Sequence, residues 1–178
     1  MSRLVLRSYV RYYTTGVSIR ATVLTHFAVG PDPSLTEGGC GRGRSIDQLA
    51  HSLQTATRAE RDGAGEEVIV ASLCHDIGKV VSVFNHPRIA CEVLRPYVSD
   101  DLRCVIQAHQ DFQGRHYYSH LGMNPDARAQ YSECSWYEIA EKFADDWDQV
   151  SFDPDYPNET LDHFEPLVQD IFSRPRSL

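Results

Sequence analysis

The sequence lacks any uninterrupted apolar run of the length that crosses a bilayer. A membrane-spanning helix needs about 20 consecutive, mostly apolar residues, and the hydrophobic residues of this chain, 42% of the total, form no such run. We therefore expect no membrane segment. Positive charge is also scarce, with 17 Lys and Arg against 25 Asp and Glu, for a formal net charge of -8. Because a negative surface repels phosphates unless it has a local basic patch, we expect no nucleic-acid partner.

Closely spaced cysteine pairs are absent too. The chain has five cysteines and no Cys-x-x-Cys motif. They are Cys40, Cys74, Cys91, Cys104 and Cys134. An odd number of widely spaced cysteines fits neither a disulfide framework nor a zinc ribbon. The pattern is typical of free thiols in a reducing compartment, so the expected location is cytoplasmic.

Acidic residues are missing from positions 1–31, which contain Arg3, Arg7, Arg11 and Arg20. This part carries a charge of +4, so the remaining residues must carry -12 to give the net charge of -8. Such a start can be an organelle transit peptide or an extension ahead of the folded domain. Residues 29–44 contain two prolines and five glycines, which predicts a loop. We accordingly divide the chain into an N-terminal extension and loop of uncertain order at 1–44 and one domain at 45–178.

Alternating strand patterns and internal repeats are not found, and apolar residues recur instead at helical spacing. Ser45 and Gln48 form a capping box for the first helix, on which Ile46, Leu49 and Leu53 make an apolar stripe. Further helices are expected at about 66–75, from 87 onward, and at about 100–110, 135–150 and 161–172. The predicted fold class is all-α, a single helical bundle.

Six side chains that can bind metal lie in or at the edge of these segments. They are His51, His75, Asp76, His86, His109 and Asp148. His75 and Asp76 are adjacent in the run SLCHDIGK, so an imidazole and a carboxylate can bind one metal while the carboxylate also reaches a second. Four imidazoles and two carboxylates suit two first-row metal ions, with positions left open for water or substrate. The pattern indicates metal chemistry.

For three of these positions the sequence also allows a plainer interpretation. His51 lies opposite the apolar stripe of its helix, and therefore faces either solvent or a polar cavity. His109 shares a helical face with Leu102 and Val105, where a histidine can simply pack. Asp145 and Asp146 are alternatives to Asp148 for the last ligand position. The two aspartates that do not bind metal would then belong to an acidic helix face in contact with solvent.

A lone His, a His-Asp pair, two further His and a late Asp on helices resemble the HD-domain superfamily. The segment QLAHSLQTATRAERDGA followed by ASLCHDIGK is most similar to its mixed-valent di-iron oxygenases, which include 2-amino-1-hydroxyethylphosphonate dioxygenase and, more distantly, myo-inositol oxygenase. The resemblance covers about residues 45–172 and implies an HD-domain bundle.

The activity that this resemblance implies is O2-dependent cleavage of the C–P bond of a hydroxylated organophosphonate, with release of phosphate. The alternative is a metal-dependent HD-domain phosphohydrolase acting on a phosphoester or nucleotide, because hydrolases of the superfamily also carry HDIGK. A regulatory domain that keeps a vestigial site is the third possibility.

The resemblance also assigns the six ligands to two iron ions, Fe2+ and Fe3+. One ion would be held by His51, His75, Asp76 and Asp148, and Asp76 would bridge to the second, held by His86 and His109. Asp148 is preferred over its two neighbours because Trp-Asp-Gln fits the late-aspartate segment of the family. Imidazole and carboxylate ligands equally suit Mn2+, Ni2+ or Zn2+, which stay open as alternatives.

The expected partners are O2 and a small anionic substrate. Lys79, three residues after Asp76, would be a cationic contact for this substrate or for oxygen. Arg115, His116 and Tyr118, which follow His109 in the chain, are candidate phosphonate contacts because Arg binds oxyanions in a bidentate way.

The chain departs from the phosphonate oxygenase pattern just before the first ligand. The family has a tyrosine and a glutamate there, and the matching positions here are Gly41 and Arg44. Because arginine cannot attract an ammonium group, the amino-substituted substrate of that enzyme is an open question for this chain. Tyr12, Tyr13 or Glu37 could take the place of the two missing residues.

Overall fold

The computed structural model describes residues 46–176, and in this range every regular element is a helix. Six α-helices are joined by short 3₁₀ turns and one π-helical turn. The α-helices are α3 (Gln48–Arg61), α4 (Glu66–Cys74), α5 (His86–Leu94), α6 (Asp100–Tyr117), α7 (Tyr137–Lys142) and α8 (Leu161–Ser173). The shorter elements are η2 (Ile77–Val80), η3 (Tyr118–Leu121), η4 (Ala127–Tyr131) and the π-helix η5 (Phe143–Asp148). The predicted all-α fold class is confirmed.

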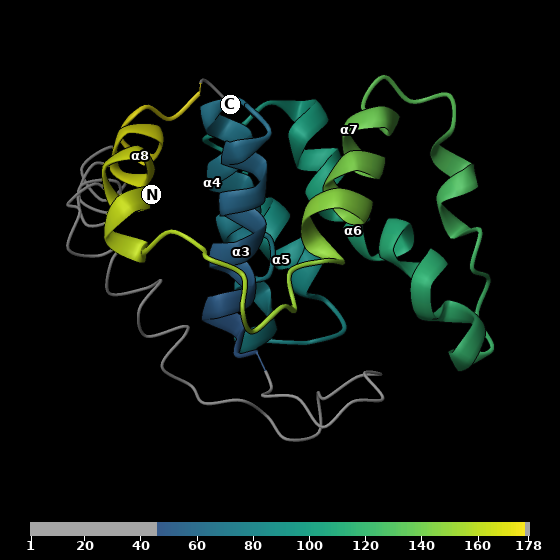
Figure 1. Ribbon diagram of the computed structural model, residues 1–178. Helices are drawn as coiled ribbons and strands as arrows, with labels where there is room; N and C mark the ends of the chain where they lie inside the picture. The colour runs from purple at the N-terminus through teal and green to yellow at the C-terminus, as the bar shows by residue number, and fades with distance from the viewer. Residues whose placement is uncertain (1–45, 177–178) are drawn as a thin grey trace.

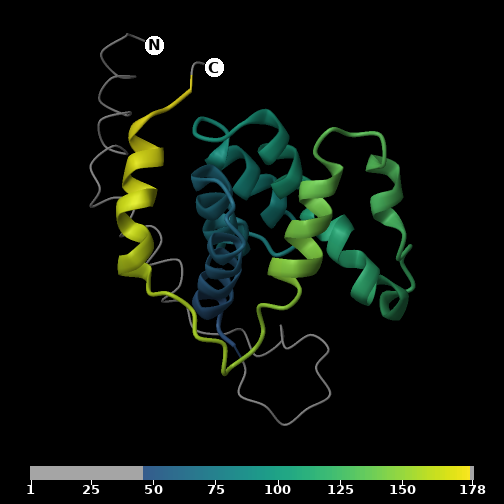
Figure 2. The same ribbon diagram turned by 45° about the horizontal axis from the view of Figure 1, so that its top comes forward.

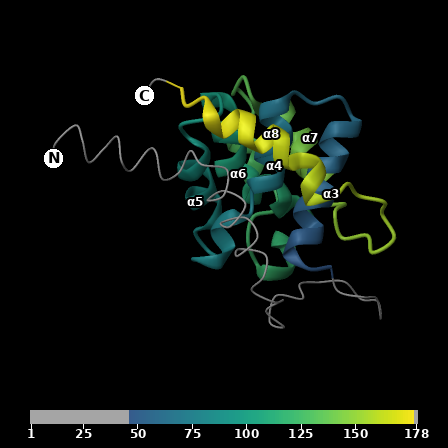
Figure 3. The ribbon, with the colours of Figure 1, turned by 90° about the vertical axis from the view of Figure 1, so that its left-hand side faces the viewer.

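The helices pack as two neighbouring pairs with a helix on each flank (Figure 1). Helix α3 packs against α4, and α5 packs against α6. The segment of α7 and η5 contacts both α3 and α6, and so joins the two pairs. Helix α8 covers α4 from outside, as Figure 3 shows with α8 crossing in front of α4. Turned as in Figure 2, η3 and η4 lie beyond α7, on the side away from α8.

Helix α3 begins where Asp47 can cap it. The Asp47 carboxylate accepts a hydrogen bond from the backbone N–H of Ala50, which satisfies one of the free donors of the first turn. The helix therefore starts later than the sequence predicted with Ser45 as its cap. Ser45, the loop at 29–44, the arginine-rich start and the residues matched to the family's tyrosine and glutamate lie outside the described residues.

Both sides of α3, the polar side and the apolar stripe, face the interior of the protein. Gln54 and Thr55, which a simple amphipathic helix would expose, are buried. The Gln54 amide donates to the backbone oxygen of Asp153 and accepts from the Asp153 backbone N–H. These bonds fix the loop between η5 and α8 along α3, and this loop is one wall of the site.

The core lies between α4, α6 and the η5 turn. Its largest fully buried side chains include Trp147, Phe112, Phe143 and Leu73. Helix α6 is longer than the predicted 100–110, because Phe112 continues its buried face and Gly114 lies directly against the Tyr118 ring. Within residues 46–176, no helix has both the length and the apolar character needed to cross a membrane.

Candidate metal centre

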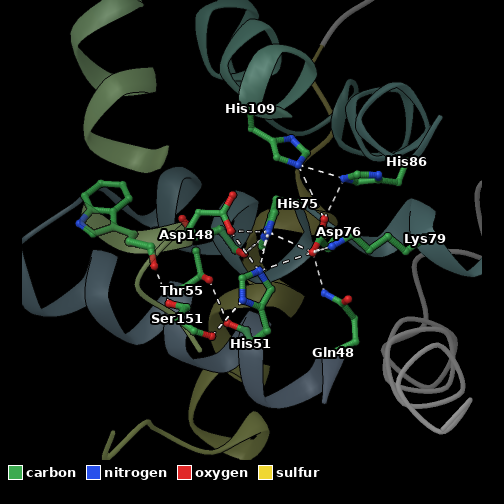
Figure 4. A network of polar contacts seen from close by, with 12 residues as sticks. Gln48, His51, Thr55, His75, Asp76, Lys79, His86, His109, Asp148 and Ser151 are labelled. Carbon is green, nitrogen blue, oxygen red and sulfur yellow. Dashed lines mark hydrogen bonds and ion pairs between the residues drawn. The ribbon is translucent and has the colours of Figure 1, made fainter. Parts of the chain in front are cut away.

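The six candidate ligands come from six different helices or helix ends, and their side chains meet at one place (Figure 4). His51 is in α3, His109 in α6, and His86 is the first residue of α5. His75 and Asp76 occupy the link between α4 and η2, and Asp148 is the last residue of η5. All six are at most 2% exposed. Of the two environments that the sequence left open for His51, solvent or a polar cavity, the structure therefore shows the buried one.

The turn after α4 brings His86 close to the His-Asp pair. Gly78 in η2 packs so tightly that an added Cβ would lie 2.4 Å from the backbone oxygen of His86 and 2.6 Å from its Cα. Only glycine permits this approach of two backbone segments. The glycine of the HDIGK run thus sets the distance between the Asp76 turn and the start of α5.

The imidazoles form two pairs that face each other through their Nε2 atoms. In one pair, His51 Nε2 lies 3.2 Å from His75 Nε2. In the other, His86 Nε2 lies 3.0 Å from His109 Nε2. Two ligand atoms bound about 2.1 Å from one metal at angles of 90–109° lie roughly 3.0 to 3.4 Å apart. Both pairs therefore have the spacing of ligands that share a metal ion.

Asp76 lies between the two pairs and offers one carboxylate oxygen to each. Its Oδ2 is 3.5 Å from His51 Nε2 and 3.4 Å from His75 Nε2. Its Oδ1 is 3.0 Å from His86 Nε2 and 3.7 Å from His109 Nε2. This is the arrangement in which one carboxylate can bridge two ions.

Asp148 completes the first pair only. Its Oδ1 lies 3.0 Å from His51 Nε2 and 3.4 Å from His75 Nε2. Asp145 points elsewhere and Asp146 is exposed. Of the three aspartates between which the sequence left a choice, the structure brings Asp148 to the cluster.

The outward nitrogen of every imidazole meets a backbone carbonyl. The Nδ1 atoms lie 2.6–3.0 Å from the oxygens of Ser151, Ser72, Val83 and Ile106. Because a carbonyl only accepts, Nδ1 must donate, and a neutral ring then carries a lone pair on Nε2. A ligating histidine characteristically donates its other N–H in this way, which fixes its tautomer and orientation.

The inward carboxylate oxygens are left without donors. Asp76 Oδ1 and both oxygens of Asp148 are buried and have no hydrogen-bond partner. His86 Nε2 is near Asp76 Oδ1, but the ring already donates through Nδ1. Such buried, unpaired oxygens are costly unless a cation or ion reaches them. Lone pairs and carboxylates aimed at common points fit two metal ions.

Without a metal, the charges of the cluster must balance through protons. Burial lowers the pKa of His75, but the carboxylates of Asp76 and Asp148 outweigh it and raise the pKa to about 10. For Asp148, burial raises the pKa, but the positive charge of His75 beside it outweighs burial and brings the pKa well below the usual range. Burial lowers the pKa of His109. The two carboxylates that raise the pKa of His75 therefore favour positive charge at the place that suits a metal ion.

Two donors contact Asp76 from outside the cluster. Lys79 Nζ and Gln48 Nε2 each lie 2.6 Å from Asp76 Oδ2. Lys79 was expected near the site, and its side chain is 27% exposed. Gln48 was interpreted only as a capping residue. Its position three residues before His51, on the same helical face, is the signal that could have revealed it.

The candidate phosphonate contacts of α6 and η3 lie in a different network. His116 Nε2 is 2.9 Å from Asp145 Oδ1, and Arg115 is 3.7 Å from Asp145 Oδ2. The buried Tyr118 directs its hydroxyl to Asp111. None of these contacts reaches the His/Asp cluster, and the role of the three residues toward a substrate stays a prediction.

Phe152 is a further neighbour that the sequence did not indicate. Its ring stacks on the His51 ring with centroids 4.4 Å apart, while 54% of the residue stays exposed. The preceding residue, Ser151, supplies the carbonyl for His51 Nδ1. The loop after η5 therefore holds the first histidine both by stacking and by a hydrogen bond.

With this geometry in view, the chain can be compared with known proteins. No family model matches it. It is similar to the [1-hydroxy-2-(trimethylamino)ethyl]phosphonate dioxygenase (glycine-betaine-forming) of Leisingera caerulea, with 32% identity over 78 residues. The match covers 38% of this chain and 40% of that enzyme, so the chain spans about two fifths of the curated relative. The relative is an oxygenase, and the buried His/Asp groups of this chain are compatible with a metal site.

Proposed function

We propose that this protein is a di-iron oxygenase of the HD-domain superfamily, whose domain spans residues 45–178. It would use O2 to cleave the C–P bond of a hydroxylated organophosphonate and release phosphate. The observation that carries the proposal is the pairing of four Nε2 atoms around one shared carboxylate, Asp76. The likeness to a phosphonate dioxygenase supports the choice of chemistry.

The six side chains would divide between two ions. His51, His75, Asp148 and Asp76 Oδ2 would hold the first, and His86, His109 and Asp76 Oδ1 the second. Iron in this setting supplies O2 activation and a template that orients the substrate. With four protein ligands for the first ion and three for the second, both ions would keep coordination positions for small molecules.

The remaining tasks fall to the protein itself. The backbone carbonyls at Nδ1 place the proton of each neutral imidazole on Nδ1, so that Nε2 presents its lone pair to the cluster, and they fix the orientation of the ring. Burial of the cluster keeps bulk water away from the reacting bond. Lys79, the partly exposed cation beside Asp76, would bind the negative phosphonate group.

The substrate class follows from the same charges. Two metal ions and Lys79 form a strongly positive site, which suits a small dianion with a neighbouring hydroxyl group. The relative is named for a phosphonate with a trimethylamino group. We propose that the substrate of this protein shares the 1-hydroxyphosphonate group of that molecule.

The decisive experiment compares aerobic and anaerobic incubation of the iron-loaded protein with [1-hydroxy-2-(trimethylamino)ethyl]phosphonate and with simpler 1-hydroxyphosphonates. Phosphate should be released only with O2, and electron paramagnetic resonance should show a mixed-valent di-iron signal. His109→Ala is the matched loss-of-ligand variant, and His163→Ala, whose imidazole pairs with Glu60 on the surface, is the control. Phosphate release from phosphoesters that continues without O2 would instead assign the site to hydrolysis.

A further inference from the structure

The two oxygens of Asp76 have opposite surroundings, although one carboxylate carries both. Oδ2 accepts hydrogen bonds from Gln48 and Lys79, each at 2.6 Å. Oδ1 has no hydrogen-bond partner and is buried. The asymmetry lies at the point where the two candidate metal positions are joined.

A count of lone pairs shows why this matters. An ionised carboxylate has about four acceptor sites, about two on each oxygen. Gln48 and Lys79 occupy both sites of Oδ2, whereas both sites of Oδ1 remain for a cation. A metal beside His51 and His75 therefore competes with one of the two donors for Oδ2. A metal beside His86 and His109 has no such competitor.

The backbone fixes both donors in place. Gln48 and His51 are three residues apart on one face of α3, so the same face supplies a candidate ligand and a donor to Asp76. Lys79 follows Asp76 by three residues in a 3₁₀ turn, where side chains at this spacing eclipse. Neither donor needs a change of backbone to reach Oδ2.

We propose that Gln48 and Lys79 play opposite parts at Asp76: Gln48 is a positioning residue that stays on Oδ2, and Lys79 yields its place to the metal. The proposal rests on the metal centre proposed above. An ammonium group is repelled by a divalent ion at the same oxygen, whereas a neutral amide is not. Gln48 then keeps the carboxylate oriented between the ions, and Lys79 becomes available to the anionic substrate.

The test is a titration of metal-free, full-length protein with Mn2+, which needs no turnover and no oxygen. Gln48→Leu should bind Mn2+ about ten- to hundredfold more weakly, the usual effect of losing an outer-shell partner. Lys79→Met should bind it roughly tenfold more tightly, because a neighbouring positive charge is gone. The melting temperature of each metal-free variant is measured in parallel.

Two matched controls are present in the chain. Gln169 also donates to a carboxylate, that of Glu165, and Lys142 pairs with Asp62, both outside the cluster. Gln169→Leu and Lys142→Met should bind Mn2+ as the unaltered protein does. If Gln48→Leu does not fold, Gln48→Asn keeps the amide but withdraws it by one methylene, and the same weakening is expected.

The outcomes separate this proposal from the one on which it rests. If the unaltered protein takes up no Mn2+, the metal centre itself is wrong and both proposals fall. If it takes up two ions and Gln48→Leu binds them equally well, only the role of Gln48 is overturned. If Lys79→Met binds Mn2+ as weakly as the unaltered protein or more weakly, the proposal that Gln48 and Lys79 act in opposite directions is overturned. A lowered metal-free melting temperature in Gln48→Leu would reduce its role to structural support.

Discussion

Replacing Gly78 by alanine tests whether the approach of the Asp76 turn to α5 is as tight as described. The new Cβ would lie 2.4 Å from the His86 backbone oxygen, 2.6 Å from its Cα and 2.8 Å from the Cβ of Ile89. Two of these atoms belong to the backbone, so no side-chain rotation relieves the contact. The chain must separate by several tenths of an ångström, and overpacking of this kind costs about 1–3 kcal/mol.

The assay is denaturant unfolding of the metal-free protein, followed by Mn2+ titration. Gly78→Ala should lower the free energy of unfolding by that amount and weaken metal binding, because His86 moves with the backbone. Gly65→Ala is the control, since nothing lies within 4 Å of its added Cβ, and the loss of the helix-capping glycine should cost at most about 1 kcal/mol. If Gly78→Ala has the same free energy of unfolding and the same affinity for Mn2+ as Gly65→Ala, the reasoning is refuted.

Two further predictions concern charge. Asp145→Asn should lower the free energy of unfolding at pH 7 by about 1–3 kcal/mol, because the carboxylate accepts from His116 and from the buried Arg128. Burial raises the Asp145 pKa, but those bonds outweigh it and lower the pKa below its ordinary value. The stability that the Asp145 carboxylate contributes is therefore complete above the ordinary carboxyl pKa, and it is lost as the pH falls through the lowered pKa of the folded protein. The difference in free energy of unfolding between Asp145→Asn and the unaltered protein should thus disappear below pH about 4. Unfolding curves that show the same difference at every pH would contradict this. Mn2+ at one hundred times its dissociation constant should stabilise the folded protein by about 2.7 kcal/mol and so raise its melting temperature. Calorimetry should find weaker binding at lower pH, because the ligands must lose protons to bind the metal.

Local patterns explain why the sequence predicted the helices well. The acids at Glu66 and Glu67, the proline after His86 and the apolar spacing of α6 act within one or two turns, and the helices start where these signals lie. The ends were less certain. Helix α6 runs to Tyr117 because its last turns pack against residues distant in sequence, which no local rule anticipates.

The residues after His109 show that closeness in sequence does not by itself bring side chains to the cluster. Arg115 and His116 follow His109 closely along the chain, but seven residues of helix span roughly 10 Å. The contacts of both side chains are with Asp145 of η5 and not with the cluster. Conversely, Gln48 stands 28 positions before Asp76, and only the packing of α3 against α4 brings the two together.

The sequence by itself determined the helical class and the chemistry available: imidazoles, carboxylates and a lysine at spacings that helices can use. Tertiary structure decided the rest. It selected Asp148 among three aspartates, turned every Nδ1 toward a carbonyl, and gave the two oxygens of Asp76 different neighbours. The physical reason is that ligand geometry is set by distances between helices, whereas residue order constrains only distances along a helix.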